Sequence, residues 1–221
     1  TDSKFATYDA TKILFRPSLA FPVSENGRLQ LRYTAESIDM RKRDANGVVI
    51  GNEIAVGKQL SSSIGYTYSY DTRRTGLNPN AGVLLRFGQE FGVGDADFIK
   101  TTALAAAETK VLNEEVTLRA TLEGGVLNYG TGDSRVTDRF FLGSRVMRGF
   151  EPGGIGPRDA NTDDALGGNA FAVARLEAEF PLGLPEEYGI SGGAFYDIGA
   201  IWGVDTTNAV GALASTGFED R

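Results

Sequence analysis

Neither cysteine nor histidine occurs among the 221 residues of the chain. Disulfide bonds, thiol nucleophiles, imidazole bases and the common zinc sites are therefore excluded, as is a Ser-His-Asp triad. Basic residues are in the minority, because 22 Lys and Arg stand against 29 Asp and Glu, a net charge of −7. Nucleic-acid binding requires clustered Lys and Arg. We therefore expect neither an enzyme nor a nucleic-acid partner, and no cofactor or metal site.

Long apolar runs are missing as well. No stretch of about 18 apolar residues occurs, so the sequence predicts no transmembrane helix. The mean hydropathy of −0.18 is in the range of water-soluble proteins. A membrane β-barrel has a similar mean, however, because its strands alternate lipid-facing and lumen-facing residues. The pattern along the chain therefore decides the class, and the mean does not.

Polar and apolar residues alternate with a period of two, which is typical of a β-strand with one wet face. Between Arg28 and Glu36, one face carries Arg, Gln, Thr and Glu side chains, and the other carries Leu, Tyr and Ala. The same pattern predicts eight strands, at residues 13–23, 28–36, 63–71, 83–91, 98–110, 115–126, 169–180 and 189–202. The Ala-rich segment 98–110 is also compatible with a helix.

The connections between the predicted strands alternate in length. Short turns are expected at residues 24–27, 112–114 and 183–187, and long loops at residues 39–60 and 128–168. Residues 71–82 are expected to form an intermediate turn that falls on the short-turn side by parity. Outer-membrane barrels show this asymmetry, with short turns on the periplasmic side and longer loops outside. The short connection 92–97 falls on the long-loop side and is an exception.

The content of the two faces separates a membrane barrel from a soluble β-sandwich, whose strands also alternate. Charged side chains recur in the middle of the predicted strands, and tyrosines occur on the apolar face. Tyr188 and Trp202 would lie near opposite ends of the last apolar face, where aromatic girdles are expected. We therefore predict an all-β fold, an antiparallel transmembrane β-barrel, which must close because unpaired strand edges are costly in lipid.

The loop 128–168 contains an apolar stretch that a solvated loop does not need, Phe-Phe-Leu-Gly-Ser-Arg-Val-Met-Arg-Gly-Phe at residues 140–150. Its last four residues, Met147, Arg148, Gly149 and Phe150, resemble a motif of the BamA family of outer-membrane assembly proteins. In that family an inward-folded sixth loop carries Arg-Gly-Phe or Arg-Gly-Tyr after Val or Leu. Further matches follow in the family's order at residues 164–170, 176–177 and 195–202.

The resemblance implies that residues 1–221 are a fragment of a C-terminal outer-membrane β-barrel domain, with eight predicted strands of a larger barrel. The POTRA domains that precede this domain in the family would be absent. The implied function is that of an outer-membrane protein assembly factor, which folds and inserts β-barrel proteins into the outer membrane of Gram-negative bacteria. The implied partners are outer-membrane lipids, unfolded β-barrel clients and, through the POTRA domains, assembly-complex lipoproteins.

Two other functions are compatible with a barrel of this kind. One is a passive porin-like channel, and the other is a two-partner-secretion transporter, which shares the loop motif. A porin constriction loop presents charge to a solute path, whereas this loop presents a phenylalanine beside a glycine. The Arg-Gly-Phe loop therefore favours the assembly factor over the porin.

Arg148 on an inward-folded loop would need a carboxylate partner. Glu177 and Asp197 are the candidates on the polar faces of the last two predicted strands, and the resemblance implies the same two. A hairpin symmetric about residues 184 and 185 would offset them by several residues, at roughly 3.3 Å each. We therefore expect Arg148 to pair with Asp197, with Glu177 as the second choice. The alternative is an exposed arginine in a solvated loop.

The neighbours of Arg148 have expected roles of their own. Gly149 would allow the backbone to turn sharply, and Phe150 would pack beside Phe195 of the barrel wall. Together these residues would form a latch, a charge-assisted contact that holds the loop against the wall.

Overall fold

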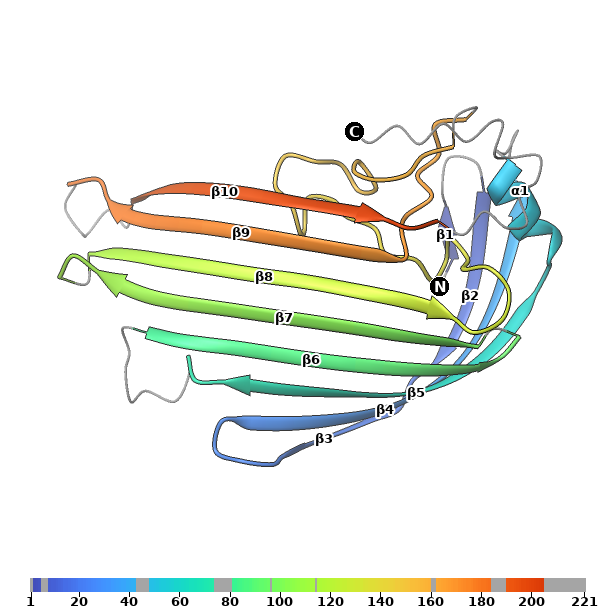
Figure 1. Ribbon diagram of the computed structural model, residues 1–221, viewed down its shortest axis with the longest axis horizontal. Coiled ribbons are helices and arrows are strands. Elements are labelled where there is room, and N and C mark those ends of the chain that lie inside the picture. The colour runs from blue at the N-terminus through green and yellow to red at the C-terminus, as the bar shows by residue number, and fades with distance from the viewer. Residues whose placement is uncertain are drawn as a thin grey trace.

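The computed structural model describes residues 2–4, 8–42, 48–73, 81–95, 97–113, 115–159, 162–183 and 190–204. These residues form one antiparallel sheet and a short helix, α1 (Val48–Ala55) (Figure 1). The strands are β1 (Asp2–Lys4), β2 (Tyr8–Phe15), β3 (Ser18–Pro22), β4 (Gly27–Lys42), β5 (Gln59–Asp71), β6 (Ala81–Gly94), β7 (Phe98–Val111), β8 (Val116–Tyr129), β9 (Ala170–Pro181) and β10 (Ser191–Trp202). None of the described residues belongs to a helix that is long and apolar enough to cross a membrane.

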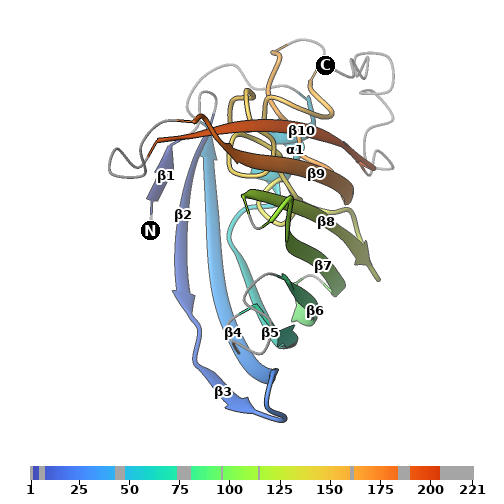
Figure 2. The same ribbon diagram turned by 90° about the vertical axis from the view of Figure 1, so that its left-hand side faces the viewer.

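The strands lie in the sheet in the order β1-β2-β4-β5-β6-β7-β8-β9-β10, with β3 also paired to β4. This order arises from successive hairpins, because a short connection joins antiparallel neighbours. Figure 2 shows that the sheet curls into an open trough, with β1 and β2 toward one rim and β9 and β10 toward the other. Among the described residues, the edge strands β1 and β10 are not paired with each other.

The eight predicted strands are confirmed, and β1 adds a further short strand at the edge. The first predicted strand begins earlier than expected and is divided into β2 and β3 at Pro17, which has no backbone N–H to donate to a ladder. The register nevertheless continues across the break, because Phe15 pairs with Ala35 and Ser18 pairs with Arg32. The Ala-rich segment is a strand, β7, and not a helix.

The prediction of a loop over residues 39–60 is wrong, because β4 extends to Lys42, α1 follows and β5 begins at Gln59. Near the C-terminal end of β4, from Ile38 onward, the alternation of polar and apolar residues between the two faces is reversed. Ile38 and Met40 are buried on the inner face, whereas the outer-facing residues beside them are polar. The pattern of an apolar outer face therefore stops before the strand does, and the upper strand packs its inner face against other parts of the chain.

The other predicted connections agree with the structure where it describes them. The loop from residue 130 to 169 joins β8 to β9 as expected. In the β7–β8 turn, Leu112 and Asn113 have φ values of 52° and 59°, the left-handed conformation that tight hairpin turns use. The predicted turn residues 74–80 and 184–187, and Tyr188 of the predicted aromatic girdle, lie outside the described residues.

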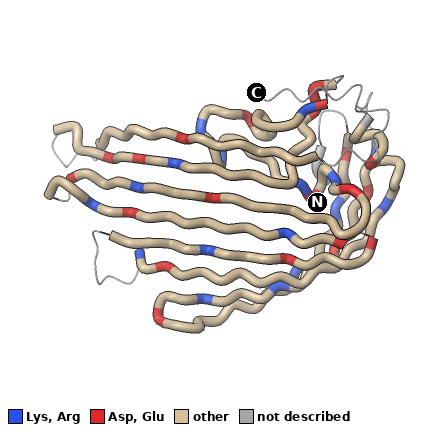
Figure 3. Tube along the Cα trace, in the orientation of Figure 1, with Lys and Arg blue, Asp and Glu red and all other residues tan. Residues whose placement is uncertain are grey.

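The two faces of the sheet differ in chemistry. Large exposed apolar side chains on the outer face include Leu31, Ile64, Phe87, Leu122, Tyr196, Ile198 and Trp202. Charged residues recur along the middle of the strands (Figure 3). Those of the inner face pair between strands, as in Arg175–Glu123 at 2.9 Å. An apolar outer face over a charged inner face is the arrangement of a membrane-barrel wall.

The loop 130–169 folds onto the concave side of the trough (Figure 2). Two apolar clusters bury its residues. The wall cluster joins the loop to β9 and β10 and consists of Leu142, Met147, Phe171, Val173 and Ile201. The upper cluster joins the loop to β2, β4 and α1 and consists of Tyr8, Ala10, Ile38, Met40, Val49, Ile50, Val136 and Leu166. The loop is therefore packed against the sheet at two places.

Candidate functional site

A tight turn in the loop places Arg148 on the wall. The backbone N–H of Met147 donates to the carbonyl oxygen of Gly143 at 2.8 Å and closes the turn. Gly149 follows with a φ of 88°, a left-handed conformation that glycine adopts without a steric penalty. Met147 itself is 4% exposed and belongs to the wall cluster. The chain is thus fixed to the wall directly before Arg148.

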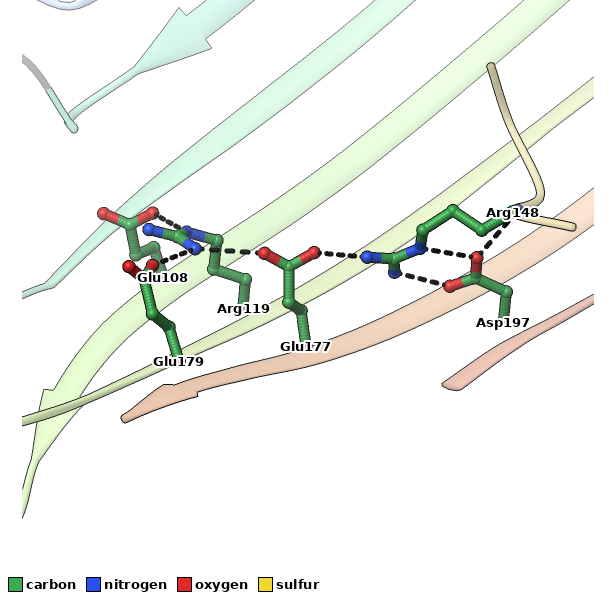
Figure 4. A network of polar contacts seen from close by, with 6 residues as sticks. All are labelled: Glu108, Arg119, Arg148, Glu177, Glu179 and Asp197. Carbon is green, nitrogen blue, oxygen red and sulfur yellow. Dashed lines mark hydrogen bonds and ion pairs between the residues drawn. The ribbon is translucent and has the colours of Figure 1, made fainter. Parts of the chain in front are cut away.

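Arg148 and Asp197 make a two-pronged contact (Figure 4). The Nε atom of Arg148 donates to Oδ2 of Asp197 at 2.9 Å, and Nη2 donates to Oδ1 at 2.7 Å. The backbone N–H of Arg148 also donates to Oδ2, at 3.0 Å. The Asp197 side chain is only 4% exposed. Water has little access to its carboxylate, and Arg148 of the loop donates the hydrogen bonds that it accepts. Bidentate charge-assisted contacts of this kind are stronger and more specific than neutral hydrogen bonds.

Arg148 also contacts Glu177, the second choice of the sequence prediction. Its Nη1 atom donates to Oε2 of Glu177 at 2.8 Å. The predicted hairpin, symmetric about residues 184 and 185, would have kept the two carboxylates apart. The observed register pairs Asp197 with Arg175, which is two residues from Glu177 on the same face, so one guanidinium reaches both acids. Hairpin register depends on the turn, and the alternation of the strands does not determine it.

The aromatic ring of Phe195 lies under the guanidinium of Arg148. The Cζ atom of Arg148 is 3.9 Å from the ring centroid, a cation–π geometry. The sequence predicts that Phe150 packs beside Phe195, but Phe150 is 42% exposed, and the described residues show no ring contact between the two. Arg148 therefore takes the place beside Phe195 that was expected for Phe150. We call Arg148, Asp197, Glu177 and Phe195 the Arg148 site.

Three further residues of the wall take part in the charge network, and the sequence prediction missed them. Arg119 on β8 donates from Nη1 to Glu177 at 3.1 Å and to Glu179 at 3.0 Å, and from Nε to Glu108 at 2.7 Å. The alternation places all of them on the polar face. Which polar residues meet across neighbouring strands depends on register, so the alternation alone could not single them out.

Gly199 of β10 leaves room for Met147. A Cβ atom at this position would lie 2.7 Å from Cγ2 of Val173 and 2.9 Å from Sδ of Met147. We expect Gly199→Val to displace Met147 from the wall cluster, at a cost of about 1–3 kcal/mol, and to make the loop 130–169 more susceptible to limited proteolysis. The matched control is Gly193→Val on the same face of β10, where the nearest atom would be 3.8 Å away. Loop cleavage at the wild-type rate in Gly199→Val would contradict the close packing.

A buried ion pair connects the loop to α1. Arg139, whose side chain is 1% exposed, lies 3.1 Å from the carboxylate of Glu53 and donates to the Ser134 hydroxyl at 2.9 Å. Oε2 of Glu53 accepts the backbone N–H of Val136 at 2.7 Å. Burial raises the pKa of Glu53 above its ordinary value of 4.5, although the attraction of Arg139 opposes the shift. The helix and the loop are thus joined through charged groups that have little access to water.

The described part of the chain holds no group of three or more Asp and Glu side chains arranged to bind a metal ion. The charged groups of the Arg148 site contact one another instead. The arrangement can therefore position the loop on the wall.

Comparison with known proteins relates this geometry to a family. The chain matches the Omp85 superfamily domain over residues 1–218. The chain belongs to the Omp85 superfamily. It is 32% identical over 195 residues to outer membrane protein assembly factor BamA of Neorickettsia risticii, covering 86% of this chain and 26% of that protein. It is 33% identical over 131 residues to the human sorting and assembly machinery component 50 homolog, covering 57% of this chain and 27% of that protein.

Solved structures of Omp85-like barrels show the same fold. BamA from Haemophilus ducreyi, solved without POTRA domains 1–3, matches with a TM-score of 0.77 and 17% identity over 91% of this chain and 44% of that chain. CdiB from Acinetobacter baumannii matches with a TM-score of 0.53 and 14% identity over 89% of this chain and 33% of that chain. The predicted barrel fold and the resemblance to the BamA family are thereby confirmed. The chain spans about a quarter of the length of the curated Omp85 relatives described above.

Proposed function

We propose that the protein to which this chain belongs is an outer-membrane protein assembly factor, which folds β-barrel proteins and inserts them into the bacterial outer membrane. The observation that carries the proposal is the agreement among relatives. BamA of Neorickettsia risticii is named an outer membrane protein assembly factor. BamA of Nitratidesulfovibrio vulgaris has the same name, and this chain is 30% identical to it over 72% of this chain and 20% of that protein. The proposed activity is non-covalent and requires no cofactor, so the protein is not an enzyme in the chemical sense.

The proposed partners follow from the two faces of the sheet. Outer-membrane lipids would contact the apolar outer face, and unfolded β-barrel clients would be the substrates. We infer that the chain is part of the C-terminal barrel domain of a longer protein, since it matches only 44% of the solved BamA chain. Lipoproteins of the assembly complex would bind through POTRA domains elsewhere in that protein.

The Arg148 site has a defined part in this proposal. The contacts of Arg148 with Asp197 and Glu177 would hold the loop 130–169 against β9 and β10, with Phe195 beneath the guanidinium and Met147 packed beside it. A loop seated in this way fills part of the trough and keeps the wall behind it in one arrangement. The supporting observation is the number of separate contacts that converge on this one side chain.

The two other barrel functions receive less support. The match to CdiB has a lower TM-score than the match to BamA. A passive channel would be expected to keep its lumen open to solutes, whereas the loop of this chain packs into the trough through two buried clusters. Assembly is therefore the function that the structure and the relatives favour together.

Reconstitution of the full-length parent protein tests the proposal. The protein is placed in liposomes, a urea-unfolded β-barrel client is added, and folding of the client is followed by its heat-modifiable migration on gels. We expect folding to be faster than in empty liposomes by about tenfold, a lowering of the barrier by about 1.4 kcal/mol. Liposomes that hold an unrelated barrel are the control. Equal rates in all three preparations would contradict the proposal, and solute efflux without client folding would favour the channel.

A further inference from the structure

One carboxylate in the wall is shared between two arginines. Oε1 of Glu177 accepts a hydrogen bond from Arg119 at 3.1 Å, and Oε2 accepts one from Arg148 at 2.8 Å (Figure 4). The two arginines come from different parts of the structure, because Arg119 belongs to the sheet and Arg148 to the loop. Glu177 is therefore the link between the wall and the loop, and whatever orients Glu177 also affects Arg148.

Arg119 bonds three carboxylates of the wall, and Glu177 is one of them. Its position in the register is opposite Glu108 on one side and Glu177 on the other. It bonds both of them and Glu179 as well, so one guanidinium connects β7, β8 and β9. Planar guanidinium groups fix carboxylates in direction as well as in distance. Arg119 thus restricts the rotation of the Glu177 side chain.

Charge balance gives a second reason. Glu108, Glu177 and Glu179 converge on Arg119, and without it three carboxylates would face one another across neighbouring strands. Like charges at such positions repel, and Glu177 would then turn away from its neighbours or toward water. In either case its Oε2 atom would leave the position in which it meets Arg148.

We propose that Arg119 is a positioning residue for Arg148, and that it acts through Glu177. The seat of the loop then depends on four neighbouring strands, from Glu108 on β7 to Asp197 on β10. A change in the spacing of β7, β8 and β9 would move Glu177 and so weaken its contact with Arg148 of the loop. A displacement of β10 would act on Arg148 through Asp197. The inference rests on the proposed function only in its relevance to assembly, and its test measures the position of the loop directly.

The test uses a cysteine reporter at Met147 in the full-length parent. Met147 is 4% exposed and directly precedes Arg148. Residues 1–221 contain no cysteine, and any cysteine elsewhere in the parent is first replaced by serine. Met147→Cys should react slowly with a maleimide while the loop is seated and faster when it leaves the wall. The reporter is combined with Arg119→Gln, with Glu177→Gln and with both, in a Met147→Cys background first shown to be folded by its heat-modifiable migration on gels.

We expect each single change to raise the labelling rate by up to about fivefold, the range that partly exposed charge pairs give. The double variant should label no faster than Glu177→Gln alone, because Arg119 has no route to Arg148 once Glu177 is neutral. Non-additivity of this kind indicates that two residues act on one interaction. A general loss of barrel stability would instead multiply the two effects.

Arg32→Gln is the matched control. Arg32 pairs with Glu90 at 3.4 Å on the inner face between β4 and β6, so its loss removes an inner-face ion pair from another part of the sheet. Labelling of Met147→Cys should not change in this variant. Should Arg119→Gln fail to fold, Glu108→Gln and Glu179→Gln are added to it, which removes the repulsion and still leaves Glu177 without its second arginine.

Two results would overturn the proposal: unchanged labelling in Arg119→Gln, or multiplicative effects in the double variant. Neither would affect the proposed assembly function, which is tested by client folding in liposomes. Conversely, a parent protein that does not fold clients could still show the coupled labelling, and the positioning role would then stand without the function.

Discussion

Charge reversal at Arg148 is expected to reduce barrel assembly by the full-length parent strongly. Arg148→Glu would set a third carboxylate between Asp197 and Glu177, which now share one guanidinium, and the loop would be repelled from the wall. We expect the amount of assembled outer-membrane protein to fall by on the order of tenfold, as when a group that positions a functional element is lost. Viability and heat-modifiable barrel proteins are measured in cells depleted of the wild-type protein.

A restored charge pattern is the control for this prediction. Asp197→Arg in the Arg148→Glu background recreates one ion pair, but Glu177 still faces the new carboxylate, so we expect partial recovery. Adding Glu177→Gln removes that repulsion and should recover more. Normal assembly by Arg148→Glu alone would show that the loop is an ordinary solvated one and that its contacts have no role in assembly.

Removal of the buried guanidinium at Arg139 is expected to detach α1 from the loop. Arg139→Ala would remove the guanidinium that pairs with the buried Glu53 carboxylate and would leave Arg135 as the nearby cation. Arg139 also donates to the carbonyl oxygen of Leu166 at 3.1 Å. Loss of one partner from a buried ion pair costs about 3–5 kcal/mol. Hydrogen exchange of the α1 amides should become much faster in this variant, while exchange in β7 and β8 stays at the wild-type rate.

A neutral partner and the pH dependence provide the controls. Glu53→Gln in the Arg139→Ala background removes the buried carboxylate that has lost Arg139 and should restore part of the protection. Burial raises the pKa of Glu53, so the folded protein binds this proton more tightly than the unfolded chain does. An acid of this kind favours the folded state increasingly as pH falls through its folded pKa. The defect of Arg139→Ala should therefore be smaller at about pH 5 than at about pH 8, and a defect that grows at low pH would contradict this assignment.

Much of the sheet could be predicted from the sequence, because alternation is a direct consequence of one face meeting lipid and the other meeting water. Alternation does not predict a strand where the outer face no longer meets lipid and the inner face no longer meets water. Ile38 and Met40 face inward beneath α1 and the loop, so the upper part of β4 has an apolar inner face and resembles a loop in the sequence. Pro17 interrupts the strand because it has no backbone N–H to donate, while the register continues across it. The alternation of side chains gives no sign of such an interruption.

The candidate site could be predicted only in part. The motif identified Arg148, and the polar faces supplied Asp197 and Glu177 as candidate partners. Whether one guanidinium reaches both depends on hairpin register, which places Asp197 opposite Arg175. The same reason hid Arg119, since its contact with Glu177 exists only because β8 and β9 pair those two positions. Register is determined by turns and by packing together, and neither can be read from one strand at a time.

The central claim is that the loop must be seated on the wall for barrels to be assembled. It is tested most directly by measuring both quantities on the same preparations: Met147→Cys labelling and client folding in liposomes, in the parent and in Arg148→Gln, Arg119→Gln and Arg32→Gln. We predict that client folding slows in the variants whose labelling accelerates, and that both stay at the parent's values in Arg32→Gln. A loop that labels rapidly in Arg148→Gln while clients fold at the parent's rate would contradict the claim.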